Sequence, residues 1–224
     1  MTLEENFRTW GIESIRSLVS NEDYEPGWFD FKEIMSGPSA IVDSNRKVAC
    51  AMANTNGGYL IFGVKDKKNR KPGDDSIVGL ILTKGPDLRR EFGHQVQLLR
   101  PGIHFDSSPK AIPIDNSGTH GVFVVQVPIS PLRPHQWDGI FWKRGDGGHC
   151  MPMDVYEVRD QMLYTADKFQ KLTLLRIELA QLNNVAVKMG DGDETRSSFR
   201  FATGAINHNT SRIDGLTKNP PIGR

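Results

Sequence analysis

The chain has 224 residues, a formal net charge of +1, and a composition that is 38% hydrophobic and 25% charged. These proportions are typical of a globular protein and exclude a largely disordered chain, and no apolar run is long enough to span a bilayer. The small net charge excludes a general attraction to polyanions, so any nucleic-acid binding must depend on how charge is distributed locally.

The first predicted element is an N-terminal helix. Apolar residues recur at near-helical spacing over residues 3–19, with Gly11 as a weak point. The opening "MTLEENFRTW" is acidic and amphipathic, whereas a secretory signal is basic and then apolar. The expected location is therefore cytoplasmic.

A short strand is expected next, in "WFDFK". Because side chains alternate across a strand, Trp28, Asp30 and Lys32 would point to one side. Phe29 and Phe31 would then point to the other side, which would be buried. The first side carries either a salt bridge on a solvent face or part of a functional site.

A second helix and a buried strand follow. Apolar residues favour a helix over residues 39–53, with Ser39 as its N-cap. "NTNGG" is expected to end this helix, because Gly57 and Gly58 adopt backbone conformations that other residues resist. The continuous apolar run at residues 59–64 is typical of a strand that is buried on both faces.

The next predicted elements are strands, with one helix among them. In chain order they are a basic loop at residues 65–71, a strand in "SIVGLIL", a helix at 87–99, and strands in "KAIPI", "GVFVVQV" and "GIFWKRG". Strands mixed with helices, several of them hairpin-like, predict one α+β domain: a single mixed-sheet lobe with helices packed on it and helical flanks.

The C-terminal part begins with a capping signal. Asp154 with Glu157 three residues later resembles a capping box that opens a long helix. Its leucines predict a packing face or, alternatively, a homodimer contact. Residues 186–224 are polar and lack periodicity, which is typical of a flexible tail. The predicted division is a helix at 1–20, a domain at 21–162, a helix at 163–185 and this tail.

Four segments in chain order resemble the landmarks of the Schlafen AlbA-like domain, a family also described as a divergent AAA or DNA-binding domain. They are "EPGWFDFKE", "ACAMANTNGGYLIFGVKD", "IVGL" and "PHQWDGIFWKRGDGGHCMP". The chain departs from the family pattern at three places. Asp30 stands where Glu is usual, Lys65 stands where an Asp is common, and Trp142-Lys143-Arg144 replaces Tyr-x-Arg.

The resemblance implies a candidate nuclease site. Some vertebrate Schlafen proteins cut transfer and ribosomal RNA with three acids of this domain, and the matching positions here are Glu25, Asp30 and Asp66. Three converging carboxylates repel one another unless a cation such as Mg²⁺ or Mn²⁺ lies between them. Lys32 would then stabilise charge in the transition state. The hypothesis is a metal-dependent endoribonuclease for structured RNA; the alternative is a non-catalytic DNA-binding or transcription-regulatory module.

Basic residues provide the candidate nucleic-acid contacts. They are Lys65, Lys67, Lys68, Arg70 and Lys71 in the basic loop, with Lys143 and Arg144 as a second cationic edge. Such contacts bind phosphates without reading sequence. Trp28 and Trp142 are candidates for stacking on unpaired bases, although packing is the commoner role of a tryptophan.

Two other chemistries are disfavoured by the residues. The sequence lacks the Gly-Lys-Ser/Thr of a nucleotide-binding loop, so no ATP is expected. His135, His149 and Cys150 lack a fourth metal ligand at a characteristic spacing, and they are expected to be structural or surface residues. The two cysteines are expected to be free thiols.

Overall fold

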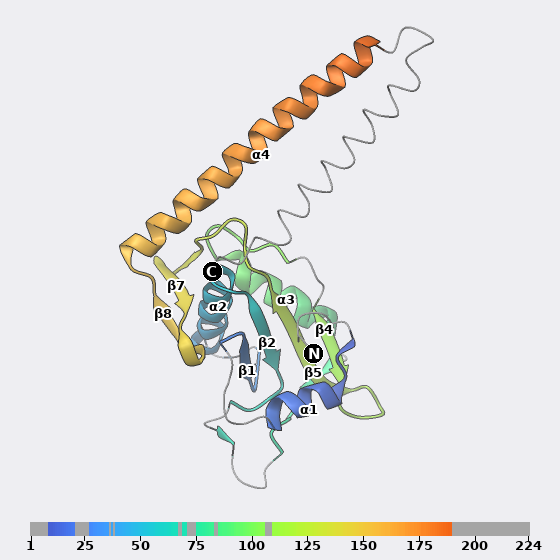
Figure 1. Ribbon diagram of the computed structural model, residues 1–224. Helices are drawn as coiled ribbons and strands as arrows, with labels where there is room; N and C mark the ends of the chain where they lie inside the picture. The colour runs from blue at the N-terminus through green and yellow to red at the C-terminus, as the bar shows by residue number, and fades with distance from the viewer. Residues whose placement is uncertain are drawn as a thin grey trace. The chain divides into compact units, whose positions relative to one another are not determined.

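The structure is a computed structural model of the chain, shown in Figure 1. It describes residues 9–20, 27–35, 37, 39–66, 69–70, 75–82, 85–105 and 109–189. The chain divides into two compact units, Met1–Gln161 and Met162–Arg224. The predicted tail at 186–224 lies almost entirely outside the described residues, apart from its first four positions, which are helical.

The elements confirm the α+β class. In order they are α1 (Ile12–Ser20), β1 (Phe29–Lys32), α2 (Ser39–Asn54), β2 (Gly58–Phe62), β3 (Leu80–Ile81), α3 (Gly85–Gln97), β4 (Lys110–Pro113), β5 (His120–Val127), β6 (Gln136–Trp137), β7 (Ile140–Arg144), a 3₁₀ turn (Asp146–Gly148), β8 (Cys150–Pro152) and α4 (Val155–Met189).

A five-stranded mixed sheet forms the centre of the first unit. Strand β1 pairs parallel to β2, and β2 pairs antiparallel to β5. Strand β5, the longest strand, also pairs antiparallel with β3 and β4. A separate antiparallel sheet is formed by β6, β7 and β8. The sheet thus joins strands that are distant in sequence, and it places the start of β1 beside the start of β2.

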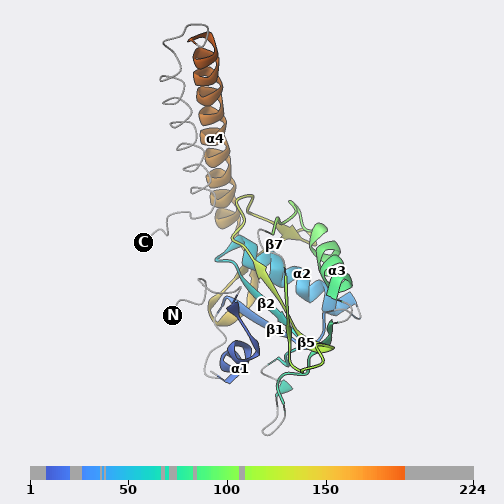
Figure 2. The ribbon, with the colours of Figure 1, turned by 90° about the vertical axis from the view of Figure 1, so that its right-hand side faces the viewer.

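Apolar side chains cover both faces of the central sheet. Helices α2 and α3 lie on one face and α1 lies on the other (Figure 2). Each face of the sheet has its own apolar core, and β2 contributes side chains to both. Leu60 and Phe62 pack in the core on the α2 side, whereas Tyr59 and Ile61 pack in the core on the α1 side. This confirms the prediction that its apolar run is buried on both faces.

Strand β1 has the predicted alternation, with one correction. Phe29 and Phe31 are buried in the α1-side core, and Asp30 points to the opposite face, in register with Leu60. Trp28, however, precedes the strand and packs against the α1-side core, with its ring centroid 5.4 Å from that of Phe29. The prediction that Trp28 points with Asp30 is wrong, because regular alternation begins only at Phe29.

Two other elements differ from their predicted extents. In "SIVGLIL" only Leu80–Ile81 forms a strand, preceded by a single bridge between Ile77 and Val64. Gly79, at φ +72°, turns the backbone between them. The predicted N-terminal helix begins at Ile12, and residues 1–8 lie outside the described residues.

Gly121 is expected to tolerate no side chain. A Cβ there would lie 2.3 Å from the Ile112 carbonyl oxygen and 2.4 Å from Leu82 Cδ1, because β4 approaches β5 closely. We expect Gly121→Ala to lower the free energy of unfolding by about 2 kcal/mol through overpacking. Gly93→Ala, in α3 with no heavy atom within 4 Å of the added Cβ, should instead raise it by about 0.5–1 kcal/mol. Urea unfolding followed by circular dichroism measures both; equal effects would contradict the close approach of the two strands.

Helix α4 begins with the predicted capping box. Asp154 Oδ1 accepts hydrogen bonds from the backbone N–H groups of Tyr156 and Glu157, at 2.8 and 2.9 Å, and Glu157 Oε2 accepts one from the Asp154 N–H at 2.9 Å. Further along the helix, Leu172, Leu175 and Leu179 are half-buried. The homodimer through this helix stays a prediction. Across the part of the chain that the structure describes, no helix has the length and apolar character of a membrane span.

Candidate functional site

Asp30 is the centre of a partly buried ion-pair cluster. Its Oδ1 lies 3.2 Å from Arg144 Nη1 and its Oδ2 lies 2.8 Å from Lys32 Nζ. The Arg144 side chain is only 5% exposed, and it also donates to the carbonyl oxygens of Gly27, at 3.0 Å, and Phe29, at 2.9 Å. Arg144 therefore joins β7 to the start of β1, with its charge balanced by Asp30.

Asn54, the last residue of α2, makes a second connection. Its Oδ1 accepts the His135 N–H at 2.6 Å, and its Nδ2 donates to the carbonyl oxygens of His135 and Trp142, both at 2.8 Å. The two bonds to His135 are shielded from solvent, because Asn54 and His135 are buried, and the bond to Trp142 is partly buried. Asn54 thus ties the segment that precedes β6, and strand β7, to the end of α2.

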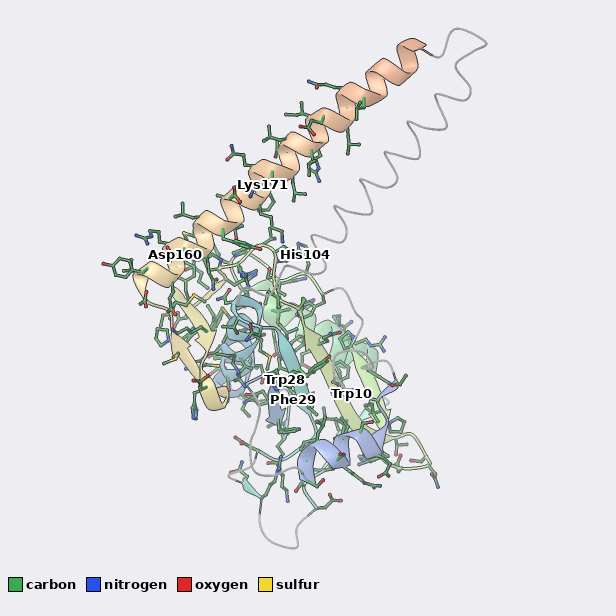
Figure 3. The ribbon with its side chains drawn as sticks, in the orientation of Figure 1. Trp10, Trp28, Phe29, His104, Asp160 and Lys171 are labelled. Atoms are coloured by element: carbon green, nitrogen blue, oxygen red, sulfur yellow. The ribbon has the colours of Figure 1, made fainter. Side chains whose placement is uncertain are left out.

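Three segments that are far apart in sequence meet around a polar hollow of about 350 Å³. The ends of β1 and β7 adjoin here, since a Cβ on Gly27 would lie 3.6 Å from the Gly145 carbonyl oxygen. Figure 3 shows Trp28 beside Phe29 at β1. The lining residues are Gly27, Trp28, Thr55, Asn56, Arg144, Gly145, Asp146 and Gly147. We call this cavity the polar hollow.

The predicted acids are described only in part. Asp30 and Lys32 lie together on β1 as predicted. Asp66 is half-buried in the loop after β2, where its carbonyl oxygen accepts the Asn69 N–H at 2.8 Å. Glu25 lies outside the described residues, so the three-acid metal site stays a prediction. Within the described ranges, no three His, Cys, Asp or Glu side chains are placed to hold a metal ion.

The basic loop is likewise described in part, since Lys67, Lys68 and Lys71 lie outside the described residues. Arg70 is directed inward. Its Nε donates to the Lys65 carbonyl oxygen at 3.0 Å, its Nη1 donates to the Val19 carbonyl oxygen at 3.2 Å, and its guanidinium lies 5.2 Å from the Phe31 ring centroid. Arg70 therefore braces the loop against the end of α1.

Cationic side chains also gather over α2 and β7. Lys47 Nζ lies 3.9 Å from the centroid of the Trp142 ring, and the Arg46 guanidinium lies 4.7 Å from the centroid of the Trp137 ring. Lys143 forms an ion pair with Glu157 while keeping part of its side chain in solvent. Trp142 packs partly against the α2-side core, so packing is one of its roles.

Sequence reasoning missed Asn54 and Asp146. Asn54 belongs to the quoted "ANTNGG" landmark and Asp146 to "KRGDGG", but neither pattern reveals which backbone or cavity the side chain faces. Arg144 was predicted as a phosphate contact, and its main partners in the structure are Asp30 and two carbonyl oxygens. A signal for Asn54 does exist, because a polar residue at the end of a buried apolar helix face needs a partner.

Burial shifts the protonation of two groups near Asn54. Burial raises the pKa of the Cys50 thiol to about 12. Burial also lowers the pKa of His135, whose Nδ1 lies 2.6 Å from the Pro101 carbonyl oxygen. This contact requires the proton on Nδ1 of the neutral ring. Both groups are therefore uncharged at neutral pH and serve packing rather than proton transfer.

The two free thiols are expected to react at different rates. Cys150 is half-buried, whereas Cys50 is fully buried and stays protonated across the neutral range because its pKa is raised to about 12. Iodoacetamide at pH 8 should label Cys150 at least about tenfold faster than Cys50, as read by peptide mass spectrometry. In urea the two rates should converge. Equal rates in the native protein would contradict the burial of Cys50.

Comparison with known proteins identifies the family. A model described as "Schlafen, AlbA_2" matches residues 25–154, which is more than half of the chain. No curated protein matches. Similar solved structures include the DIP2311 protein from Corynebacterium diphtheriae, with 22% identity and a TM-score of 0.38 over 64% of this chain and 30% of that chain. They also include the N-terminal domain of a protein from Nitrosomonas europaea described as related to the ATP-dependent DNA helicase RecG, with 20% identity and a TM-score of 0.39 over 62% of this chain and 94% of that chain.

The chain therefore spans less than a third of the length of the first of these structures. The matched range of the family model includes β1, α2, the central sheet and the β6–β8 sheet, which together carry the ion-pair cluster, the Asn54 bonds and the polar hollow. The chain belongs to the Schlafen AlbA_2 family.

Proposed function

We propose that this protein is a nucleic-acid-binding module that engages single strands at the polar hollow. The observation that carries this proposal is the convergence of three separate segments, around Trp28, Thr55 and Arg144, on one hollow of about 350 Å³. An aromatic ring, amide and hydroxyl groups, and backbone groups together suit an unpaired nucleotide. Membership of the Schlafen AlbA_2 family supports the same class of ligand.

The neighbouring cations supply a path for the phosphate backbone. Lys143 keeps part of its side chain in solvent, and Lys47 lies over Trp142 on the adjacent face of α2. Ammonium groups of this kind neutralise phosphates without reading base identity, and binding then weakens as salt rises. The proposed interface therefore combines a non-specific cationic edge with a hollow for one unpaired base.

The role of Asp30 in this proposal is structural. Both of its carboxylate oxygens face cations, and removal of either cation would leave charge in a partly buried place. Asp30 fixes Arg144, and Arg144 in turn fixes the Gly27 carbonyl at the wall of the hollow. Binding, rather than hydrolysis, is the function that these contacts support best.

The binding proposal is tested with fluorescence anisotropy. A labelled 12-nucleotide single strand of RNA or DNA should bind more tightly than a duplex of the same sequence, and its affinity should fall between 50 and 200 mM salt, by about an order of magnitude if few phosphates are contacted. A Lys47→Ala/Lys143→Ala variant should weaken binding and flatten the salt dependence. Arg16→Ala, which removes a cation paired with Glu13 on α1, is the matched control and should change neither. Absence of salt-dependent binding to any polynucleotide would overturn the proposal.

A metal-dependent endoribonuclease is the second candidate, because Asp30 and Lys32 lie 2.8 Å apart on one strand, as an acid and a lysine of a nuclease site would. Glu25, Asp30 and Asp66 would hold the Mg²⁺ or Mn²⁺ ion, which would polarise a phosphoryl oxygen. Incubation of purified protein with transfer RNA and Mn²⁺ tests this candidate. Cleavage that disappears in a folded Asp66→Ala variant would support it, and binding without cleavage would favour the binding module.

A further inference from the structure

The chemistry of the polar hollow points to one particular base. We propose that the hollow receives an unpaired guanine and that Asp146 recognises its Watson–Crick edge. The inference rests on the proposed nucleic-acid binding and extends it by naming the ligand. It concerns a residue that was assigned no role from the sequence and whose carboxylate forms no hydrogen bond with another described residue.

The walls of the hollow are fixed before any ligand binds. The Gly27 carbonyl is held by Arg144, whose side chain is almost fully buried. The Gly145 N–H donates to the His149 carbonyl at 2.8 Å, and the Gly145 carbonyl accepts the Gly148 N–H at 3.2 Å. The Thr55 hydroxyl donates to the Ala51 carbonyl at 2.7 Å. A pre-formed site loses little conformational entropy when it is filled.

The size of the hollow suits one base rather than a duplex. A volume of about 350 Å³ is at the lower end of the range for small-molecule sites. Trp28 is a half-buried lining residue: part of its side chain packs against the α1-side core, and the part that lines the hollow can contact a purine. A paired base cannot enter such a cavity without leaving its stack. The ligand is therefore a base from a single strand or from a free nucleotide.

The charge of the lining excludes phosphate and selects the base. Arg144 is already balanced by Asp30, so the exposed carboxylate of Asp146 is the remaining charge in the lining. A carboxylate repels phosphate, and it accepts two parallel hydrogen bonds from adjacent donors. Among the four bases, only guanine presents two adjacent donors, N1–H and N2–H, on its Watson–Crick edge. The exposed amide of Asn56 can donate to O6 of the same base.

The other bases fit the same lining less well. Adenine and cytosine each place an unprotonated ring nitrogen beside their amino group, and this lone pair would face a carboxylate oxygen. Uracil has one N–H between two carbonyl oxygens. A strand that carries one of these bases would lose the paired hydrogen bonds to the Asp146 carboxylate, and adenine or cytosine would also place a lone pair against it.

The experiment compares single strands that differ at one base. Uridine-rich 12-mers with a central guanine, inosine, adenine or cytosine are titrated by fluorescence anisotropy at fixed salt. The wild-type protein should bind the guanine strand at least about tenfold more tightly than the adenine strand, with inosine, which lacks the N2 amino group, in between. Asp146→Asn should remove this preference while leaving the affinity for the adenine strand equal or higher, because a negative charge is lost.

Asp138→Asn is the matched control. It makes the same charge change at an exposed turn residue outside the hollow, and the backbone φ of +52° at Asp138 suits asparagine. It should keep the full guanine preference. Thermal melting of both variants confirms that they are folded.

The outcomes separate the two proposals. Salt-dependent binding with equal affinity for the guanine and adenine strands would overturn the guanine inference and leave the binding function intact. A preference that persists in Asp146→Asn would also overturn it. Binding of free guanosine monophosphate over adenosine monophosphate, without binding of any strand, would support the guanine site, assign it to a free nucleotide, and overturn the binding function.

Discussion

Replacement of Asn54 by alanine is expected to lower the free energy of unfolding by about 4 kcal/mol, which is a large effect for one substitution. The alanine would remove hydrogen bonds to the His135 N–H, the His135 carbonyl and the Trp142 carbonyl. Each buried backbone group left without a partner costs roughly 1–3 kcal/mol. Of the polar bonds from α2 to this segment, the Cys50 thiol bond to the His135 carbonyl oxygen, at 3.3 Å, would remain, whereas the His135 N–H and the Trp142 carbonyl would lose Asn54 as their partner. Both the ion-pair cluster and the polar hollow depend on the position of the β6–β8 sheet.

Urea unfolding monitored by tryptophan fluorescence measures the Asn54→Ala effect. Asn56→Ala is the matched control, because Asn56 is two residues further along the chain and exposed. The control should change the free energy of unfolding by less than about 0.5 kcal/mol. An Asn54→Ala protein with wild-type stability would show that the three bonds are replaced by others or are unimportant.

Asp30→Ala is expected to lower the free energy of unfolding by about 3–5 kcal/mol, because it leaves the Arg144 guanidinium almost fully buried without a counter-charge. Lys32→Ala should have a smaller effect, about 1 kcal/mol, since the Lys32 side chain is 21% exposed and water screens its ion pair. A double variant, Asp30→Leu with Arg144→Met, should recover most of the lost stability, because it removes both charges together. Thermal and urea unfolding of the four proteins provide the comparison.

The sign of the Asp30→Ala effect distinguishes the two candidate functions. Carboxylates gathered for a metal ion repel one another when the ion is removed, so the loss of one would stabilise the metal-free protein. Carboxylates in a structural ion pair give the opposite sign. A gain in stability for Asp30→Ala in EDTA, together with a melting temperature of the wild type that rises with Mn²⁺, would contradict the structural role.

Much of the fold follows from local patterns in the sequence. The period of the apolar residues predicted α2 and β5 close to their observed bounds, and the alternation of Phe29, Asp30 and Phe31 predicted which face of β1 is buried. The capping box at Asp154 was also predicted, because its two partners are three residues apart. Trp28 was assigned to the wrong side, since the pattern did not show where the strand begins.

The amino-acid sequence by itself determined the α+β class, the family resemblance and the elements whose partners are close along the chain. Only the tertiary structure decided that Arg144 balances Asp30, 114 residues away, and that Asn54 holds the backbone of His135, 81 residues away. The polar hollow was decided in the same way, by the meeting of three distant segments. The physical reason is that periodicity and capping depend on neighbours within a few residues, whereas the partner of a buried charge or amide depends on which distant segments the sheet brings together.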